Sequence, residues 1–369
     1  MTATPATARR RLSMITAMGL VAVSSLAMSS VATAGVTEDA LSPAASDRAP
    51  SQRPGVQRYH HRSKVGAQSL RAVVLDRAAE GEGSKVIDLR IGRTAAKVNS
   101  RSPIPVRSTS KSLGGRGLAD LDLSGVLTGI TAEAGPTKGA DIQPNQTLVP
   151  LPLEPLLSLG VSTGEAAARW NGPGSCVPTG KKATSATTST ADVALLPDIV
   201  PGLPSLLSVD GLVSSSQSLR YLDRKNGRLG MRAAGSTSIV GLSLFGAVTI
   251  RLVSPPKLVA VATGRPGKAK VKYTPAVVQI EGPDGAPIPI PSPGDLPTEF
   301  SLPANPLLGL SIQLPGIQAQ KVSENGRLAR AKAVTLRISV TLGGVGLADI
   351  SVAPLQAKVK VPRGGIACN

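Results

Sequence analysis

The stretch Val334–Leu342, with the sequence VTLRISVTL, decides the fold class. Its apolar residues alternate with Thr, Arg and Ser, which is the two-residue period of a strand with one buried face and one wet face. The same period recurs in Lys85–Ile91, in Leu355–Val361 and across Leu242–Leu252, where Gly246 fills the gap between two apolar runs. Such alternation is typical of antiparallel sheets. The sequence therefore predicts an all-β protein built from antiparallel, β-sandwich-like sheets.

The composition agrees with many strands joined by turns, since the chain has 39 Gly and 31 Pro. Prolines cluster in residues 141–160 and 283–306, which we expect to be stiff connectors. Glu165–Trp170 (EAAARW) is predicted to form a short helix. The motif of Gly114–Asp120 recurs in Gly343–Asp349, and this repeat predicts a hairpin turn used twice in a duplicated β unit.

Residues 1–34 are typical of a signal peptide. Arg9–Arg11 form a basic region, Met14–Met28 form an apolar stretch, and Ala32–Ala34 (ATA) supplies a small-x-small cleavage site. The apolar stretch is too short to span a membrane as a helix. We therefore expect cleavage after Ala34 and a protein that is secreted or on the cell surface. The general secretory route and the twin-arginine route both stay open.

The rest of the chain is predicted to divide by composition. Residues 35–66 lack apolar periodicity and are expected to form a disordered basic tether. Residues 67–369 form the β-rich region, and the sequence leaves open whether it consists of two subdomains, 67–178 and 179–369. The residue directly after the predicted cleavage site is Gly35 and not Cys, and no apolar tail ends the chain, so we expect neither a lipid anchor nor a membrane anchor.

Two cysteines, Cys176 and Cys368, remain after removal of the signal. An even number of cysteines in an exported chain predicts one disulfide, which would link the C-terminal end to the segment that follows Trp170. Two unpaired thiols are the alternative. A metal site is not expected, because two Cys and the distant His60–His61 pair are too few ligands for a four-coordinate centre.

Charge points to an anionic partner. The formal net charge is +18, and residues 48–116 carry 15 basic against 4 acidic residues. This excess predicts attraction to an anionic cell-wall polymer or membrane surface, although a solvated basic face that only aids solubility would give the same count. Nucleic acid is not an expected partner, because the chain is predicted to be exported and is poor in aromatic residues for base stacking. The alternative function is that of an extracytoplasmic carrier, with a lipid or other hydrophobic ligand between the sheets.

Two motifs resemble those of serine enzymes but lack their partners. Gly160–Gly164 (GVSTG) matches the GxSxG nucleophile elbow, which needs a histidine base later in the chain. Only His60–His61 are present, and they precede Ser162, so the hydroxyl would stay a weak nucleophile. Ser108–Lys111 (STSK) fits SxxK without the other motifs of that class. The sequence therefore predicts no catalytic residue.

Other site chemistry is not expected either. Asp120 and Asp122 lie on one side of a predicted strand, with no second group that would make an acid–base pair in a cleft. Phosphate loops, dinucleotide fingerprints and calcium loops do not occur in the sequence. We expect a non-catalytic protein without a cofactor or a bound metal.

Three stretches resemble one group of exported proteins. They are Gly211–Ser216 (GLVSSS), Arg232–Ser238 (RAAGSTS) and Gly241–Ile250 (GLSLFGAVTI). Together they are similar to uncharacterised secreted surface proteins of high-GC Gram-positive bacteria, grouped as choice-of-anchor P. This resemblance implies an exported, β-rich protein of the cell envelope and assigns no functional residue.

Overall fold

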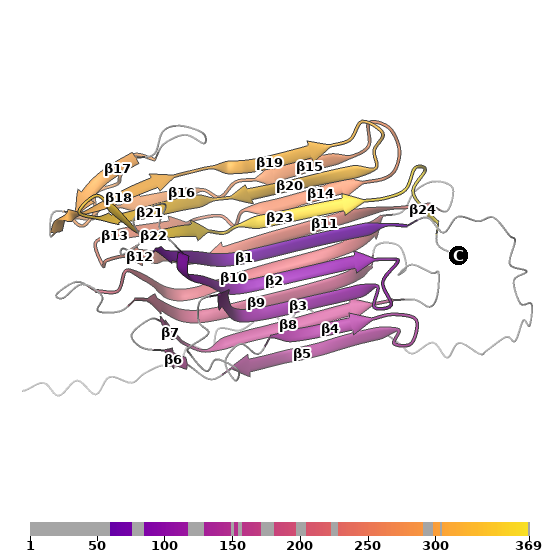
Figure 1. Cartoon of the computed structure of the whole chain (residues 1–369), viewed down its shortest axis with the longest axis horizontal. Helices are drawn as coiled ribbons and strands as arrows, with labels where there is room; N and C mark the ends of the chain where they lie inside the picture. The colour runs from indigo at the N-terminus through magenta and orange to yellow at the C-terminus, as the bar shows by residue number, and fades with distance from the viewer. Residues whose placement is uncertain are drawn as a thin grey trace, which may run out of the picture. The chain divides into compact units, whose positions relative to one another are not determined.

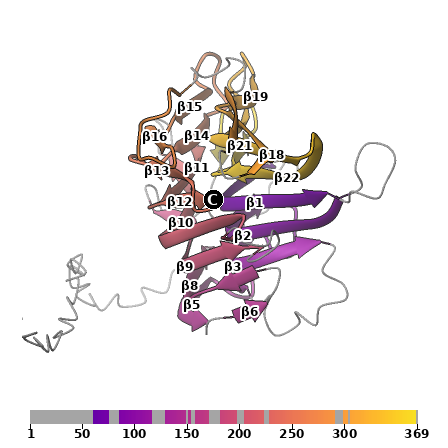
Figure 2. The same cartoon turned by 90° about the vertical axis from the view of Figure 1, so that its left-hand side faces the viewer.

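The computed structural model describes residues 60–75, 85–116, 129–148, 151–153, 157–170, 181–196, 204–222, 228–290, 298–302 and 305–367. These residues contain no helix and form antiparallel strands, as the alternation predicts. The strands make two sheets that pack face to face (Figures 1 and 2). The first sheet contains β1 (Arg62–Leu75), β2 (Lys85–Asn99), β3 (Val106–Arg116), β4 (Ile130–Ala134), β17 (Thr298–Leu302), β18 (Asn305–Gln313), β19 (Gly316–Val322), β20 (Leu328–Val334), β21 (Leu336–Leu342), β22 (Val345–Val352) and β23 (Leu355–Lys360).

The second sheet is formed by the middle of the chain and by one short strand near its end. It contains β5 (Ala140–Leu148), β6 (Leu151–Leu153), β7 (Leu157–Leu159), β8 (Ser162–Arg169), β9 (Lys182–Leu195), β10 (Leu207–Leu222), β11 (Arg228–Ile239), β12 (Leu242–Leu244), β13 (Val248–Leu252), β14 (Lys257–Ala262), β15 (Lys270–Thr274), β16 (Val278–Glu281) and β24 (Ile366–Ala367). Figure 2 shows β9 and β10 in the layer opposite β1, β2 and β3.

Each sheet divides into two branches at one long strand. In the first sheet, β1 pairs with β23 over Arg62–Ala67 and with β22 over Leu70–Val74. The strands β23, β20 and β19 make one branch, and β22, β21, β18 and β17 make the other. In the second sheet, β10 pairs with β11 over Val213–Leu222 and with β12 at Leu207 and Ser208. The four branches lie at the top of Figure 1, with β19 and β15 toward one end and β18 and β13 toward the other.

The interior contains two separate apolar clusters, one at each end of the strands. One cluster, which we call the large-residue core, is dominated by Leu and Ile and includes Leu89, Leu336 and Ile338. The other, the alanine-rich core, includes Ala260 and Ala331 together with a few larger side chains: Trp170, Tyr221, Met231 and Ile366. The same long strands contribute to both, so the division runs across the sheets and not between them.

Buried polar side chains separate the two cores, and they bond from one sheet to the other. Ser108 Oγ donates to Ser185 O at 2.8 Å, and Ser110 Oγ donates to Thr187 O at 2.7 Å. Gln217 Nε2 donates to Ser108 Oγ at 3.0 Å. We call these residues, with Thr94, Thr188 and Ser215, the Ser/Thr layer. Such short side chains can reach main-chain oxygens across the interface only where the sheets approach more closely than usual, which small residues permit.

The regular pairing of β1 with β2 is interrupted at Ser69 and Gly92. Beyond this point the residues that point between the sheets shift by one position along each strand. The residues between the sheets are Thr94 and Ala96 on one side of the interruption, and Ile91 and Leu89 on the other. Gly92 has φ +60°, and a Cβ there would lie 2.6 Å from Ser69 Oγ, so this position requires glycine. The shift allows one strand to supply both cores.

The structure corrects the helix expected at Glu165–Trp170. That segment belongs to β8 and to the residue after it, and Ala166 and Ala168 are buried in the alanine-rich core. Alanine prefers helices in isolation, but here its small size fits the narrow space between two sheets. The prediction of a short helix is wrong because packing overrides propensity.

The repeated glycine motif occupies two different settings. Gly343 and Gly344, with φ +59° and +80°, form the turn between β21 and β22, as predicted. Gly114 and Gly115, the first two residues of the other copy, lie inside β3 opposite Arg90 and Leu89 of β2. The rest of that copy, Gly117–Asp120, lies outside the described residues, so the turn expected there stays a prediction.

The boundaries expected from composition do not separate the strands. β1 begins at Arg62, inside the expected tether, because Ser63 and Val65 are buried there while Arg62 and Lys64 face solvent. Strands from residues 67–178 and from residues 179–369 share both sheets, since β1 pairs with β22 and β23 and β8 pairs with β9. The predicted signal peptide, Cys176 and Cys368, and Asp120 and Asp122 lie outside the described residues.

Candidate functional site

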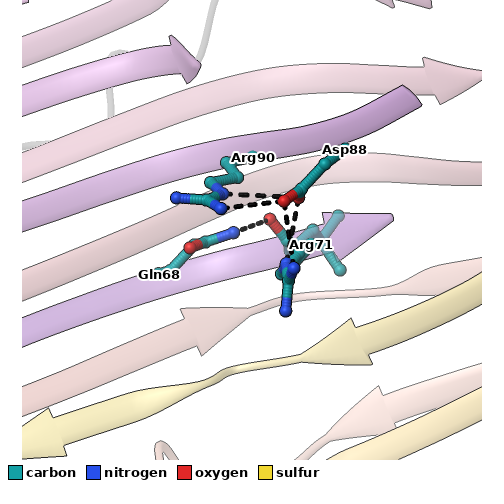
Figure 3. A network of polar contacts seen from close by, with 5 residues as sticks. Gln68, Arg71, Asp88 and Arg90 are labelled. Carbon is teal, nitrogen blue, oxygen red and sulfur yellow. Dashed lines mark hydrogen bonds and ion pairs between the residues drawn. The ribbon is translucent and has the colours of Figure 1, made fainter. Parts of the chain in front are cut away.

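Polar and charged side chains on the outer face of the first sheet make two contrasting regions. Over the large-residue core, the carboxylate of Asp88 accepts hydrogen bonds from Arg71 (2.9 and 3.0 Å) and from Arg90 (3.3 and 2.8 Å) (Figure 3). Burial alone would raise the pKa of Asp88. The bonds and charges of the two arginines outweigh burial, and they hold that pKa well below its ordinary value.

The neighbouring charges in this region are also matched. Arg337 on β21 pairs with Asp349 on β22, and the charge of Asp349 also reaches Arg71. On the second sheet, Arg251 pairs with Glu281 at 3.4 Å. The outer faces over the large-residue core therefore neutralise much of their own charge, as a structural surface does.

The outer face over the alanine-rich core is different, because six cations lie opposite one another in register across six adjacent strands. Arg107 of β3 faces Lys97 of β2, and Lys97 faces Lys64 of β1. The series continues through β23, β20 and β19 with Lys358, Arg330 and Lys321. At a strand spacing of about 4.8 Å, these six positions span roughly 24 Å. We call this series the cation row.

Most of the cation row has no acidic partner. Arg107 pairs with Glu133 of β4, which faces it at one end of the row. The other five side chains are exposed and form no ion pair with any residue that the structure describes: Lys64, Lys97, Lys321, Arg330 and Lys358. Like charges placed opposite each other on neighbouring strands repel, so the row costs the folded protein stability. The row therefore leaves five exposed positive charges without compensation from the described residues.

Two hollows extend the basic surface beside the row. One, of about 520 Å³, is lined by Lys64, Arg330, Lys332 and Lys358 among others. The second, of about 660 Å³, lies where the branches of the first sheet separate, and it shares Lys332 and Gln356 with the first hollow. Arg93, which lines the larger hollow, has its pKa lowered by burial and by the charge of Arg90. The two hollows therefore continue the row toward the fork of the sheet.

The second sheet carries its own basic hollow on its outer face, again over the alanine-rich core. This hollow has a volume of about 590 Å³. Its lining combines the basic side chains of Arg232, Lys270 and Lys272 with the apolar side chains of Val259 and Val261. Positive charge is thus concentrated at one end of the sandwich on both faces.

The structure places the residues of the two rejected enzyme motifs in ordinary packing. Ser162 is buried in β8 and donates from Oγ to Thr190 Oγ1 at 3.1 Å. Ser108 points into the Ser/Thr layer, whereas Lys111, three positions on in β3, faces solvent. The described residues hold no group of three or more His, Cys, Asp or Glu that could bind a metal. The same described residues contain no helix that is long and apolar enough to cross a membrane.

The cation row could not be found from sequence alone. Its members come from six separate strands between residues 64 and 358, and only the register of those strands brings them together. The visible signal was the alternation of Lys with apolar residues, as in Ala357–Lys360. No family model matches this chain, and no curated protein matches it either.

Proposed function

We propose that this protein is an exported, non-catalytic component of the bacterial cell envelope with a structural or adhesive role. In this proposal, residues 1–34 direct export and are cleaved after Ala34, and the basic surface holds the folded protein to anionic material of the envelope. The observation that carries the proposal is the cation row, where five exposed cations lack an acidic partner among the described residues. An unpaired basic face attracts polyanions and anionic surfaces over a Debye length of about 10 Å at 0.1 M salt.

The alternative, a carrier of a lipid or other hydrophobic ligand, has less support. A carrier needs an apolar cavity, and the space between the described strands is filled by the two cores and the Ser/Thr layer. The hollows described above lie on the outer faces, and each has several charged side chains in its lining. We therefore prefer surface attachment over transport.

A salt-extraction experiment tests the proposal. Cells that produce the full chain are washed in steps of rising sodium chloride, and the protein released at each step is measured. We expect the protein to stay with the cells at low ionic strength and to be released as the Debye length falls to about 3 Å near 1 M salt. Protein that is found only in the medium at low salt, or that stays on the cells at high salt, would contradict electrostatic attachment.

A further inference from the structure

We propose that the cation row binds one extended polyanion that carries phosphate groups along its chain, and that this polyanion lies across the strands from β3 to β19. This inference rests on the proposed function and names the partner class at the same surface. It follows from the geometry of the row, from its neighbours and from the kinds of cation that it contains.

The cation row is the longest run of positive charge on this face. On the side away from the fork, the neighbouring row adds the facing pair Arg62 and Lys360, while its positions Asn99 and Leu328 are uncharged. The row that neighbours the cation row on the side of the fork is Thr109, Ala95, Gly66, Gln356, Lys332 and Ala319, in the same strand order. Only one of these six residues is charged, and three are Gly or Ala. A line of charge beside a row of mostly small, neutral side chains fits a chain of anions. A flat anionic bilayer would be matched better by charge spread over the whole face.

The length of the row suits a polymer. Six cations over roughly 24 Å exceed the reach of a single phosphate or a small anionic metabolite, which could contact only two or three of them. Each contacted charge adds attraction and releases a counterion from the polymer, so affinity for a chain grows with the number of cations that the chain covers. An extended polyanion is the partner that can use the entire row.

The side chains of the row suit phosphate groups. Four of the six cations are Lys, which binds phosphate as a point charge, so most of the row does not use the two-pronged geometry by which Arg recognises carboxylate and phosphate alike. Of the two arginines, Arg107 is already paired with the carboxylate of Glu133. Phosphate groups within a chain also keep their negative charge across the pH range in which carboxylates become protonated.

The experiment measures binding of the full chain to long-chain inorganic polyphosphate, with orthophosphate, tripolyphosphate, polyglutamate and anionic phospholipid vesicles as comparisons. The row variant is Lys64→Gln/Lys97→Gln/Lys358→Gln. The matched control is Lys181→Gln/Lys182→Gln/Lys257→Gln, which removes the same charge from exposed positions in or directly before two strands of the second sheet. These positions line neither the row nor the basic hollow there. Thermal unfolding of each variant checks that it is folded.

We expect the row variant to bind long polyphosphate about tenfold or more weakly, with a shallower dependence on salt, and the control to change by less than about twofold. Wild-type affinity should rise steeply from orthophosphate to the long chain and should exceed that for polyglutamate. Equal losses in the two variants would show that net charge and not the row is responsible, and would overturn the inference. Equal binding of polyglutamate, or preferential binding of vesicles through the row, would overturn it as well.

The two proposals fail in different ways. If the row variant still binds polyphosphate normally while the wild-type protein is released from cells by salt, the row is not the contact and the proposed function stands. If the wild-type protein does not associate with cells at any ionic strength, the proposed function fails whatever polyphosphate does in solution.

Discussion

The two ends of the sandwich differ in side-chain size inside and in charge outside. Among the described residues, the large-residue core has 15 Leu and 8 Ile in a cluster of 34, whereas the alanine-rich core has 15 Ala in a cluster of 28. Outer charges over the first core form ion pairs, and those over the second are largely unpaired. Large side chains bury more apolar area per residue, so the first end supplies more stability. The second end carries the exposed charge that a partner would use.

The predicted disulfide would strengthen the weaker end, and this gives the largest expected effect. Trp170 and Ile366, which precede Cys176 and Cys368 in the chain, both lie in the alanine-rich core. On the chain-entropy model, a bridge that closes so long a loop stabilises the fold by about 4–5 kcal/mol. Urea unfolding with and without reductant measures that difference, with the double variant Cys176→Ser/Cys368→Ser as the control. Two free thiols in the mature protein, detected by mass spectrometry, would contradict the pairing.

Truncation of one side chain at each end tests the difference between the cores. Leu89→Ala removes a fully enclosed side chain from the large-residue core and should lower the free energy of unfolding by about 2–5 kcal/mol. Ala331→Gly can remove only one methyl group from the alanine-rich core, and with the added flexibility of glycine it should cost about 1 kcal/mol. Chemical denaturation of both variants gives the comparison. Equal losses would show that the two cores contribute alike.

Asp88 tests the paired charges over the large-residue core. Asp88→Asn leaves Arg71 and Arg90 without their shared anion, and we expect it to cost about 1–3 kcal/mol at neutral pH. The pKa of Asp88 is lower in the folded state than in the unfolded state. The carboxylate therefore adds to the free energy of unfolding above the unfolded pKa of about 4, and this contribution is lost as the pH falls further. The difference between the unfolding midpoints of the two proteins should therefore stay constant from pH 7 to about pH 4 and narrow as the pH falls toward 2. A difference that stays constant down to pH 2 would exclude this account.

Relief of repulsion in the cation row should give the smallest change in stability. Unlike the substitutions above, it should make the protein more stable. Lys97 lies between Lys64 and Arg107, so Lys97→Gln should stabilise the protein by a few tenths of a kcal/mol. The control Lys272→Gln, which faces Val259, should leave stability unchanged. Thermal unfolding at low salt is the measurement, and the gain should shrink as salt is added. A loss of stability in Lys97→Gln would show that the row is not under strain from its own charge.

The fold class followed from local patterns, but the branching did not. In Val334–Leu342 the alternation of apolar residues is unbroken, yet β20 ends at Val334 and β21 begins at Leu336. Thr335 between them is buried, with its hydroxyl 3.3 Å from Tyr273 Oη. The two strands join different branches because β20 pairs with β23 and β21 with β22. Partner choice depends on residues far away in the chain, which a local period does not encode.

The division of the interior was visible in the sequence but needed the structure to be interpreted. Along β10 the inward residues change from Val213 through Ser215 and Gln217 to Leu219, that is, from one core through the Ser/Thr layer to the other. By itself this run looks like a strand with weak amphipathicity. The division becomes clear only when inward residues of the same kind are seen to lie side by side on several strands. The cation row likewise becomes clear only when its members are seen side by side on neighbouring strands. Net charge predicted an anionic partner, whereas the strand register brings together the cations that we propose bind it.

The register of β1 with β23 has a mechanical consequence. Arg62 at the start of β1 lies opposite Lys360 at the end of β23, so both strands enter or leave the fold at the same end. A force that pulls these two points apart would load the hydrogen bonds of this strand pair one after another, as in unzipping, and would not stretch them together. The pair would therefore open at low force from its ends.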